Sequence, residues 1–121
     1  MRTIIVTTTT DTWATAQKIG EYTQSTVDLR LEEVGFIHCT KPDQTVAMLN
    51  RRLKNRDDLL LLLVDVDKVV PEVKFEATQS GTPGLFPHIY GPLNVDAVYG
   101  TILPTKDSSG NFVASTVLSN L

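Results

Sequence analysis

Apolar side chains along this chain follow two periods, and each period predicts a different kind of element. Residues 3–8 are β-branched almost throughout, a composition that favours an extended strand. Residues 12–19 follow as a helix that Thr10 or Asp11 caps, because short polar side chains accept hydrogen bonds from first-turn amides. Gly20 ends that helix, since glycine adopts the left-handed conformation of a helix C-cap without strain.

A second strand and a second helix are predicted further along. Residues 36–39 form the short strand, and Thr40 is predicted to cap the helix that follows. Val46, Leu49 and Leu53 recur at the spacing of a buried helical stripe. The helix ends in a cluster of cations: Arg51, Arg52, Lys54 and Arg56. These charges complement the carbonyl end of the helix dipole, and contact with an anionic ligand is the alternative explanation.

Strands dominate the second half of the chain. Residues 59–66 form a continuous apolar run of strand length, which predicts a central strand buried on both faces. Residues 73–78 alternate, so Phe75 and Glu76 face opposite ways. The remaining expectations are an irregular connection at 22–33, a Gly/Pro-rich loop at 79–84, a short strand or turn at 89–90, a strand at 95–103 and an edge strand at 112–117. Two helices come before most of the strands, which indicates an α+β fold in a single domain over residues 1–121.

Composition and charge exclude several classes of partner. The chain has 121 residues, 41% of them hydrophobic and 21% charged, as in an ordinary globular domain. A net charge of −3 provides no field that would draw nucleic acid. The longest apolar run, residues 59–64, is too short to span a membrane, and no signal-peptide pattern is present. A single cysteine, Cys39, rules out an internal disulfide, so we expect a cytoplasmic protein.

Both histidines lie in short extended segments bounded by glycine or proline. His38 follows Gly35 closely, and His88 lies between prolines that stiffen its segment. Tyr90 is two residues beyond His88 and therefore shares its face in a strand, while Glu76 lies on the preceding strand. These groups predict a small-molecule cleft in which the imidazoles bind a hydroxyl or phosphate and the carboxylate stabilises positive charge. The alternative is that each histidine is hydrogen bonded within the sheet and has only a structural role.

Other chemistry is disfavoured by spacing. Adjacent strand residues point to opposite faces, so His38 and Cys39 do not form a nucleophile–base pair, and Cys39 is expected to be a buried apolar residue. Two histidines and one cysteine without clustered spacing do not provide a zinc site, so no metal is expected. The loop at 81–84 lacks the lysine and helix of a phosphate-binding loop.

The same segments carry a family resemblance. They comprise Trp13, Ala16 and Gly20-Glu21-Tyr22; Gly35-Phe36-Ile37-His38-Cys39-Thr40 with Gln44; Phe75-Glu76; and Leu85-Phe86-Pro87-His88-Ile89-Tyr90-Gly91-Pro92-Leu93 with Ala97-Val98. In this order they resemble the small family known as domain of unknown function 952. Members look like the ADP-ribosyltransferase superfamily, which implies a mixed, split β-sheet with a cleft for NAD.

The resemblance also implies roles for individual residues. Glu76, His38 and His88 are the candidate catalytic residues, and Tyr90, Thr40 and Phe36 are the candidate residues for binding the cofactor, NAD. The chain differs from the family pattern in the first strand, where relatives often have His or Lys and this chain has Val6. The loss of that polar contact weakens the case for conventional NAD binding.

Three functional hypotheses follow. The chain is an enzyme acting on NAD or another ribosyl-phosphate ligand; or it is a non-catalytic module that binds a small metabolite or a protein partner in the same cleft; or its motifs only stabilise the sheet. Each hypothesis is compatible with a monomer or weak homodimer that binds neither nucleic acid nor membrane.

Overall fold

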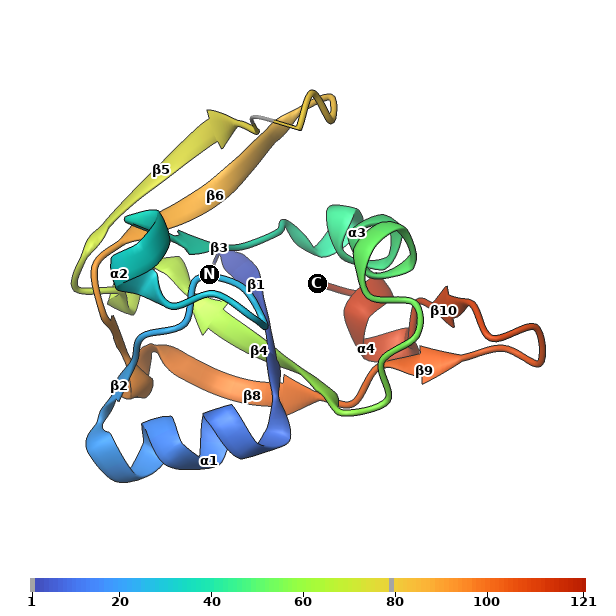
Figure 1. Cartoon of the computed structure of the whole chain (residues 1–121), viewed down its shortest axis with the longest axis horizontal. Helices are drawn as coiled ribbons and strands as arrows, with labels where there is room; N and C mark the ends of the chain where they lie inside the picture. Colours follow the sequence, from blue (N-terminus) through green and yellow to red (C-terminus); the bar gives the residue numbers. More distant parts are fainter. Residues whose placement is uncertain (1, 79) are drawn as a thin grey trace.

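A computed structural model describes residues 2–78 and 80–121 of the chain (Figure 1). Its centre is a three-stranded antiparallel sheet in the order β1 (Thr3–Thr9), β4 (Leu59–Asp65) and β8 (Val98–Ile102). All seven residues of β4 are buried, so the prediction of a central strand covered on both faces is confirmed. Alternate residues of β4 supply two separate apolar clusters, Leu60 and Leu62 on one face and Leu61 and Leu63 on the other.

Helices cover the two faces of this sheet. α1 (Thr10–Ile19) packs Trp13 and Ala16 into the first cluster, and α3 (Thr45–Arg52) packs Met48 and Leu49 into the second (Figure 1). The N-cap of α1 is Thr9, one or two residues before the predicted Thr10 or Asp11. Its side chain accepts a hydrogen bond from the amide of Thr12. Gly20 ends α1 as predicted, with φ of 95° and its N–H bonded to the carbonyl of Ala16.

A second antiparallel sheet has the order β3 (Ile37–His38), β6 (Leu85–Tyr90) and β5 (Glu72–Ala77). The short strand or turn predicted at 89–90 is the end of a longer strand, because β6 begins at Leu85 and continues through Pro87 in the middle of this sheet. Backbone N–H and C=O groups of one strand residue point to the same edge. The carbonyl of Pro87 accepts from Cys39, so its missing N–H faces β3, where the ladder stops at His38.

The two sheets meet at a single bridge. The backbones of Ile5 in β1 and Thr40 exchange two hydrogen bonds, of 2.8 and 2.9 Å. The sheet is therefore split, as the resemblance implied, but every strand pair in the described residues is antiparallel and the predicted mixed sheet was wrong. The α+β class and two main helices are confirmed.

Smaller elements complete the structure. They are β2 (Glu21–Tyr22), α2 (Leu31–Val34), η1 (Pro42–Gln44), η2 (Val66–Lys68), β7 (Leu93–Asn94), η3 (Val95–Ala97), β9 (Thr105–Lys106), β10 (Phe112–Val113) and α4 (Thr116–Ser119). The irregular connection predicted at 22–33 contains part of β2 and α2, and the strand predicted at 95–103 begins as η3. Of the loop predicted at 79–84, Gln79 lies outside the described residues.

Two further expectations were wrong for local reasons. Thr40 does not cap the second helix, because η1 intervenes and the buried Thr40 hydroxyl bonds instead to Thr45, at 2.8 Å. The edge strand predicted at 112–117 stops after β10, where Ser115 caps α4 by accepting the amide of Leu118. In the described part of the chain no helix is long and apolar enough to cross a membrane.

The buried sheet generates a stability prediction. Leu62 in β4 is 0% exposed, so Leu62→Ala should lower the free energy of unfolding by about 2–5 kcal/mol through lost burial and a new cavity. Leu103→Ala is the matched control, because Leu103 is 66% exposed and its truncation should cost less than about 0.5 kcal/mol. Urea unfolding of both variants measures the difference, and equal losses would contradict the packing described for β4.

Candidate functional site

The two histidines face each other across neighbouring strands. His38 in β3 is paired with His88 in β6, and the amide of His38 donates to Ser25 rather than to β6. This makes the two histidines a non-hydrogen-bonded pair, the arrangement that brings opposing side chains closest in an antiparallel sheet. The Nδ1 of His38 lies 3.4 Å from the Nε2 of His88.

A carboxylate and a phenol continue this contact. The other nitrogen of His88, Nδ1, lies 2.9 Å from the Oε1 of Glu76, which is diagonally across from it on β5. Tyr90 donates its hydroxyl proton to the same oxygen. Four predicted site residues are thus joined in one chain of contacts, His38–His88–Glu76–Tyr90, which we call the relay.

Aromatic rings cover the relay. Phe36 stacks on His88 with a centroid separation of 4.0 Å and also contacts the ring of Tyr90. Phe86, 3% exposed, stacks on His38 at 5.7 Å. His88 itself is only 4% exposed, so its ring is held with little access to water. Low polarity around such a chain strengthens each of its hydrogen bonds.

The surroundings fix the charge of the relay groups. Hydrogen bonds from Tyr90 and His88 hold the pKa of Glu76 below its ordinary value, so Glu76 is ionised at neutral pH. The same contact raises the pKa of Tyr90, which keeps its proton. Burial, followed by the charges of His88, Arg52 and Arg51, lowers the pKa of His38 to about 4. His38 is therefore neutral at pH 7.

These charges settle where the protons lie in the neutral relay. A carboxylate only accepts, so Nδ1 of His88 carries the proton bonded to Glu76. With both imidazoles neutral, Nε2 of His88 has a lone pair, and the proton between the rings belongs to Nδ1 of His38. The Nε2 of His38 is left with a lone pair, and no group among the described residues bonds to it.

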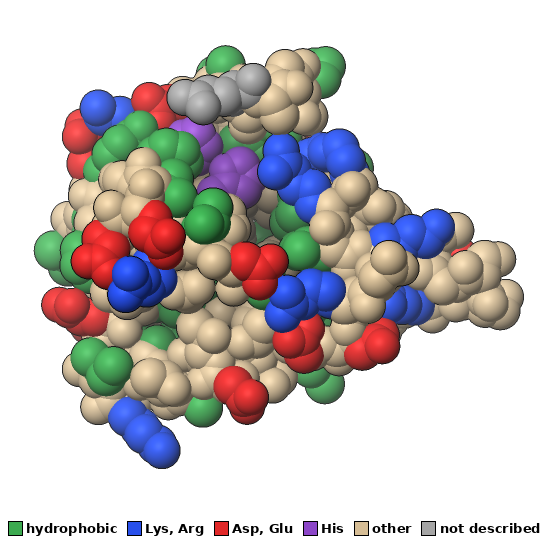
Figure 2. Space-filling view, viewed as in Figure 1, with side chains coloured by type: hydrophobic (Ala, Val, Ile, Leu, Met, Phe, Trp, Pro, Cys, Tyr) green, Lys and Arg blue, Asp and Glu red, His purple; other side chains and the backbone are tan. Residues whose placement is uncertain are grey.

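The relay ends at a cavity of about 370 Å³. His38 forms part of its wall, together with Thr7 of β1, the segment around Ser25 and the α3 residues Met48 and Arg52. Figure 2 shows the two histidines next to each other beside a hollow in the surface, with basic side chains gathered over α3. A neutral imidazole therefore borders a concave site of the size that small ligands occupy.

The cavity wall contains one cation without an ion pair among the described residues. Asp28 also lines it, and its carboxylate shares Arg56 with Asp58, at 3.0 and 2.8 Å. Arg52 has no ion pair with any residue that the structure describes, and Arg51 is close enough to act on the pKa of His38. Arg52 therefore provides a guanidinium without an ion pair to any described residue at the cavity wall.

Two buried hydroxyls in the wall lack partners. Ser25 is 2% exposed and Thr7 is 9% exposed, and neither hydroxyl bonds to another described residue. A buried polar group without a partner costs free energy, so such groups are rare unless a ligand or water satisfies them. Their place in the cavity wall adds hydrogen-bonding capacity to the site.

The remaining candidates lie elsewhere. Thr40 is buried with its hydroxyl bonded to Thr45, and it does not line the cavity. Cys39 is buried among apolar residues, which raises the pKa of its thiol, and the prediction of a core residue is confirmed. Val6 packs in the cluster beneath α1. Within residues 2–78 and 80–121, no group of three His, Cys, Asp or Glu side chains is placed to hold a metal ion.

Local sequence patterns provided little indication of which residues form the cavity wall. Ser25 belongs to a segment predicted to be irregular, and Thr7 is one of several threonines in β1. The cluster of cations at the end of α3 was the one available signal, through its alternative explanation as an anion contact. These residues line one cavity only because β1, α3 and residues 25–29 come together beside His38.

Comparison with known proteins places the chain in a family. Residues 7–101 match the model of a family described as "Protein of unknown function (DUF952)". The chain is similar to the crystal structure of protein CC0527 from Caulobacter crescentus, with 27% identity, a TM-score of 0.80 and coverage of 97% of this chain and 98% of that one. The solution NMR structure of CC0527 gives 28% identity, a TM-score of 0.74 and coverage of 92% and 91%. No curated protein matches.

The relay makes a prediction about tautomers. At pH 8 the Nδ1 atoms of both His38 and His88 should carry the proton, because the carboxylate of Glu76 orients both rings. Long-range ¹H–¹⁵N correlation spectra distinguish the two ring nitrogens. In Glu76→Gln the amide has no full charge to impose this order, so a mixture of tautomers should appear; a proton on Nε2 of His38 in the wild type would contradict the relay.

The low pKa of His38 predicts a pH dependence of stability. Between its ordinary pKa of 6.5 and about 4, the unfolded chain binds a proton that the folded chain does not, so stability falls as pH falls through this window. From pH 7 to pH 5 this contribution amounts to roughly 2 kcal/mol. Denaturant unfolding of wild type and His38→Gln at both pH values isolates it. The variant should lose less stability on acidification, and identical losses would show that the pKa of His38 is not depressed.

Proposed function

The chain belongs to the DUF952 family, and we propose that this member is a small-molecule enzyme in which His38 accepts a proton from an anionic ligand held beside Arg52. The observation that carries the proposal is the relay itself. It runs from the carboxylate of Glu76 through His88 to His38, which lines a cavity and whose Nε2 bonds to no described residue. General base catalysis requires a lone pair within reach of a ligand proton.

The relay compensates for the weak basicity of His38. When Nε2 of His38 takes a proton from a ligand hydroxyl, the proton on its Nδ1 passes to Nε2 of His88. The positive charge then lies on His88, 2.9 Å from the Glu76 carboxylate, and the ligand oxygen keeps the electron pair of the broken O–H bond. The favourable pairing of His88 with Glu76 offsets part of the cost of charging a buried imidazole.

The cavity favours a small hydroxylated anion as the ligand. Arg52 supplies a charge without a partner, and Ser25 and Thr7 offer hydroxyls without partners. A phosphate or carboxylate matches the guanidinium, and sugar-like hydroxyls match the wall. A volume of about 370 Å³ is at the lower end for ligand pockets, which favours a ribosyl phosphate over a complete dinucleotide.

The relation to ADP-ribosyltransferases enters only as a hypothesis about this ligand. In that hypothesis Glu76 contacts the ribose directly and supports positive charge at the anomeric carbon, with NAD as the cofactor. The contacts of Glu76 with Tyr90 and His88 instead support a role in positioning the relay. Chemistry on NAD therefore requires a separate test.

A binding experiment tests the ligand class. Ribose 5-phosphate should bind in isothermal titration calorimetry and ribose should not, because the phosphate pairs with Arg52. Arg52→Gln should weaken binding by about tenfold or more, the effect of losing a charge-assisted hydrogen bond. Arg51→Gln is the matched control, since Arg51 does not line the cavity and its loss should have a smaller effect.

A turnover experiment separates the enzyme from the non-catalytic module. Ribose 5-phosphate, ADP-ribose and NAD are incubated with the protein and followed by ³¹P nuclear magnetic resonance. Conversion that His38→Gln abolishes while binding persists would support the enzyme. Binding without conversion of any of these compounds would favour the module, and no binding at millimolar concentration would remove the proposed ligand class.

A further inference from the structure

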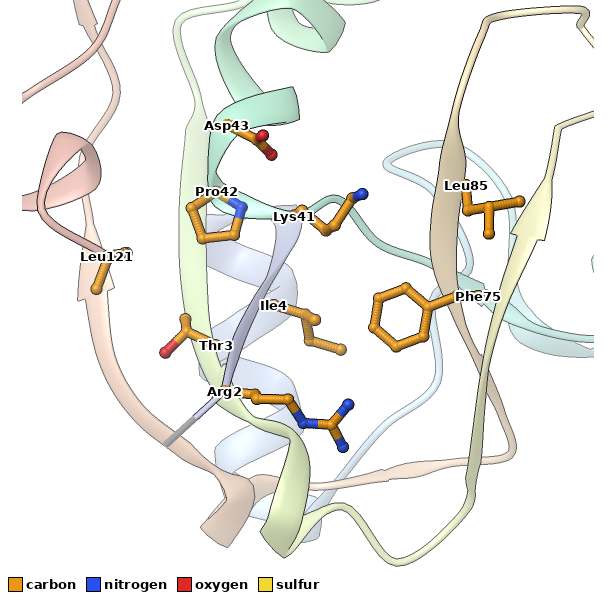
Figure 3. Close-up of a pocket in the computed structure, with 9 residues that line it drawn as sticks. All are labelled: Arg2, Thr3, Ile4, Lys41, Pro42, Asp43, Phe75, Leu85 and Leu121. Carbon is orange, nitrogen blue, oxygen red and sulfur yellow. The ribbon is translucent and has the colours of Figure 1, made fainter.

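The β5–β6 hairpin has a second face that the relay does not use. In its register Glu76 and His88 point to one side, while Phe75 and Leu85 point to the other. This second face borders a cleft of about 710 Å³ that also involves Ile4, Arg2 and Lys41 (Figure 3). We call it the hairpin cleft. It and the relay thus lie on opposite sides of the same pair of strands.

An apolar stripe of the hairpin continues beyond the protein core. Ile89 is fully buried, whereas Phe75 and Leu85, on the same face, are 37% and 50% exposed. The hairpin projects from the body of the molecule at this point (Figure 1). Large apolar side chains gathered at the wall of a concave site are typical of places where a ligand is bound.

Cations stand opposite this apolar wall. Figure 3 shows the side chains of Arg2 and Lys41 extending from the far side of the cleft toward the space in front of Phe75. Lys41 has no ion pair in the described part of the chain. Arg2 has one exposed contact with Asp67, at 3.9 Å, of a kind that contributes little. Among the described residues, Asp43 is the one lining side chain that carries a carboxylate, compared with these two cations.

Gln44 joins the two walls. Its Nε2 donates to the carbonyl of Leu85 on the hairpin at 2.8 Å, and its Oε1 accepts from the amide of Lys41 at 2.8 Å. One side chain thus fixes the apolar wall relative to the turn that carries a cation. A site whose walls are already in place loses less conformational entropy when a ligand binds.

We propose that the hairpin cleft binds an amphipathic monoanion. The carboxylate lies between Arg2 and Lys41, and the alkyl or aromatic part packs on Phe75 and Leu85. A volume of about 710 Å³ suits a small molecule. The combination of two cations with an apolar wall requires both ends of the ligand, since a short carboxylate lacks the apolar contact and a neutral or cationic chain lacks the charge.

Octanoate serves as the probe. Acetate is the matched control without the long alkyl chain, and octyltrimethylammonium is the matched control with the opposite charge. In ¹H–¹⁵N correlation spectra, octanoate should shift the amides of Lys41, Phe75 and Leu85 in a saturable way at millimolar concentration. Neither control should do so. Saturable binding of octyltrimethylammonium at the same amides, or no shifts with octanoate, would overturn the proposal.

Variants then test each wall. Arg2→Gln combined with Lys41→Gln should weaken octanoate binding by about tenfold or more, and Phe75→Ser should have a similar effect. All three side chains are at least partly exposed, so these variants should fold. Lys18→Gln removes an exposed charge from α1 and should leave binding unchanged. Unchanged affinity in the double variant would refute the assigned site.

The cavity beside His38 provides an independent control. His38→Gln should bind octanoate as the wild type does, because His38 does not line the hairpin cleft. The hairpin-cleft proposal and the proposed function can therefore fail separately. Loss of octanoate binding in His38→Gln would indicate that octanoate binds in the cavity beside His38, and it would contradict the proposal that the hairpin cleft is the binding site.

Discussion

The pairing of β3 with β6 is the constraint on which the candidate site depends. Its register places His38 opposite His88 at a position where the backbones exchange no hydrogen bonds, so the two imidazoles approach each other closely. A slip of one residue would turn His38 toward the core and bring Ile37 and Cys39 to the relay face. Burial of Ile37 and Cys39, which are 0% and 1% exposed, opposes that slip. Apolar packing on one face of β3 therefore positions the chemistry on the other.

The backbone around this pairing is also set by residues without polar side chains. Pro87 removes the N–H that would extend the ladder with β3 beyond His38. The segment after β3 then separates from β6, and its residue Thr40 pairs with Ile5 of β1. The short strand β3 is thus held between two sheets, and His38 lies where the split between them borders α3. This position gives one nitrogen of His38 to the relay and leaves the other at the cavity.

The β5–β6 hairpin carries two kinds of surface because its faces alternate. Polar groups of one face form hydrogen bonds with each other beneath Phe36, so few of their donors and acceptors need water as a partner. Apolar groups of the other face begin in the core at Ile89 and end exposed at Phe75 and Leu85. In most hairpins of a small domain the outer face is polar. Here the polar face carries the relay residues Glu76, His88 and Tyr90, and the exposed apolar residues of the opposite face line the hairpin cleft.

Local sequence patterns determined the elements whose environment is uniform along their length. The run of apolar residues in β4 predicted burial on both faces, and the spacing of His88 and Tyr90 predicted their common face, because these features depend only on strand geometry. Strand alternation also separated Cys39 from His38. The length of β6 was missed because its pairing with β3 joins residues distant in sequence. The start of α3 and the helix α4 were missed because of local hydrogen bonds, from Thr40 to Thr45 and from the amide of Leu118 to Ser115.

Tertiary structure alone decided which polar groups share a cavity. Ser25 and Thr7 come from an irregular segment and a strand, and nothing in their local sequence distinguishes them from exposed residues of the same type. Arg52 belongs to the cluster of cations at a helix end, for which an anion contact was only the alternative explanation. Their contact with the space beside His38 follows from how these three segments pack around β3. The face to which a side chain points depends on one strand, so alternation in the sequence predicts it. Which side chains of separate elements come into contact depends on tertiary packing, and no periodic pattern predicts that.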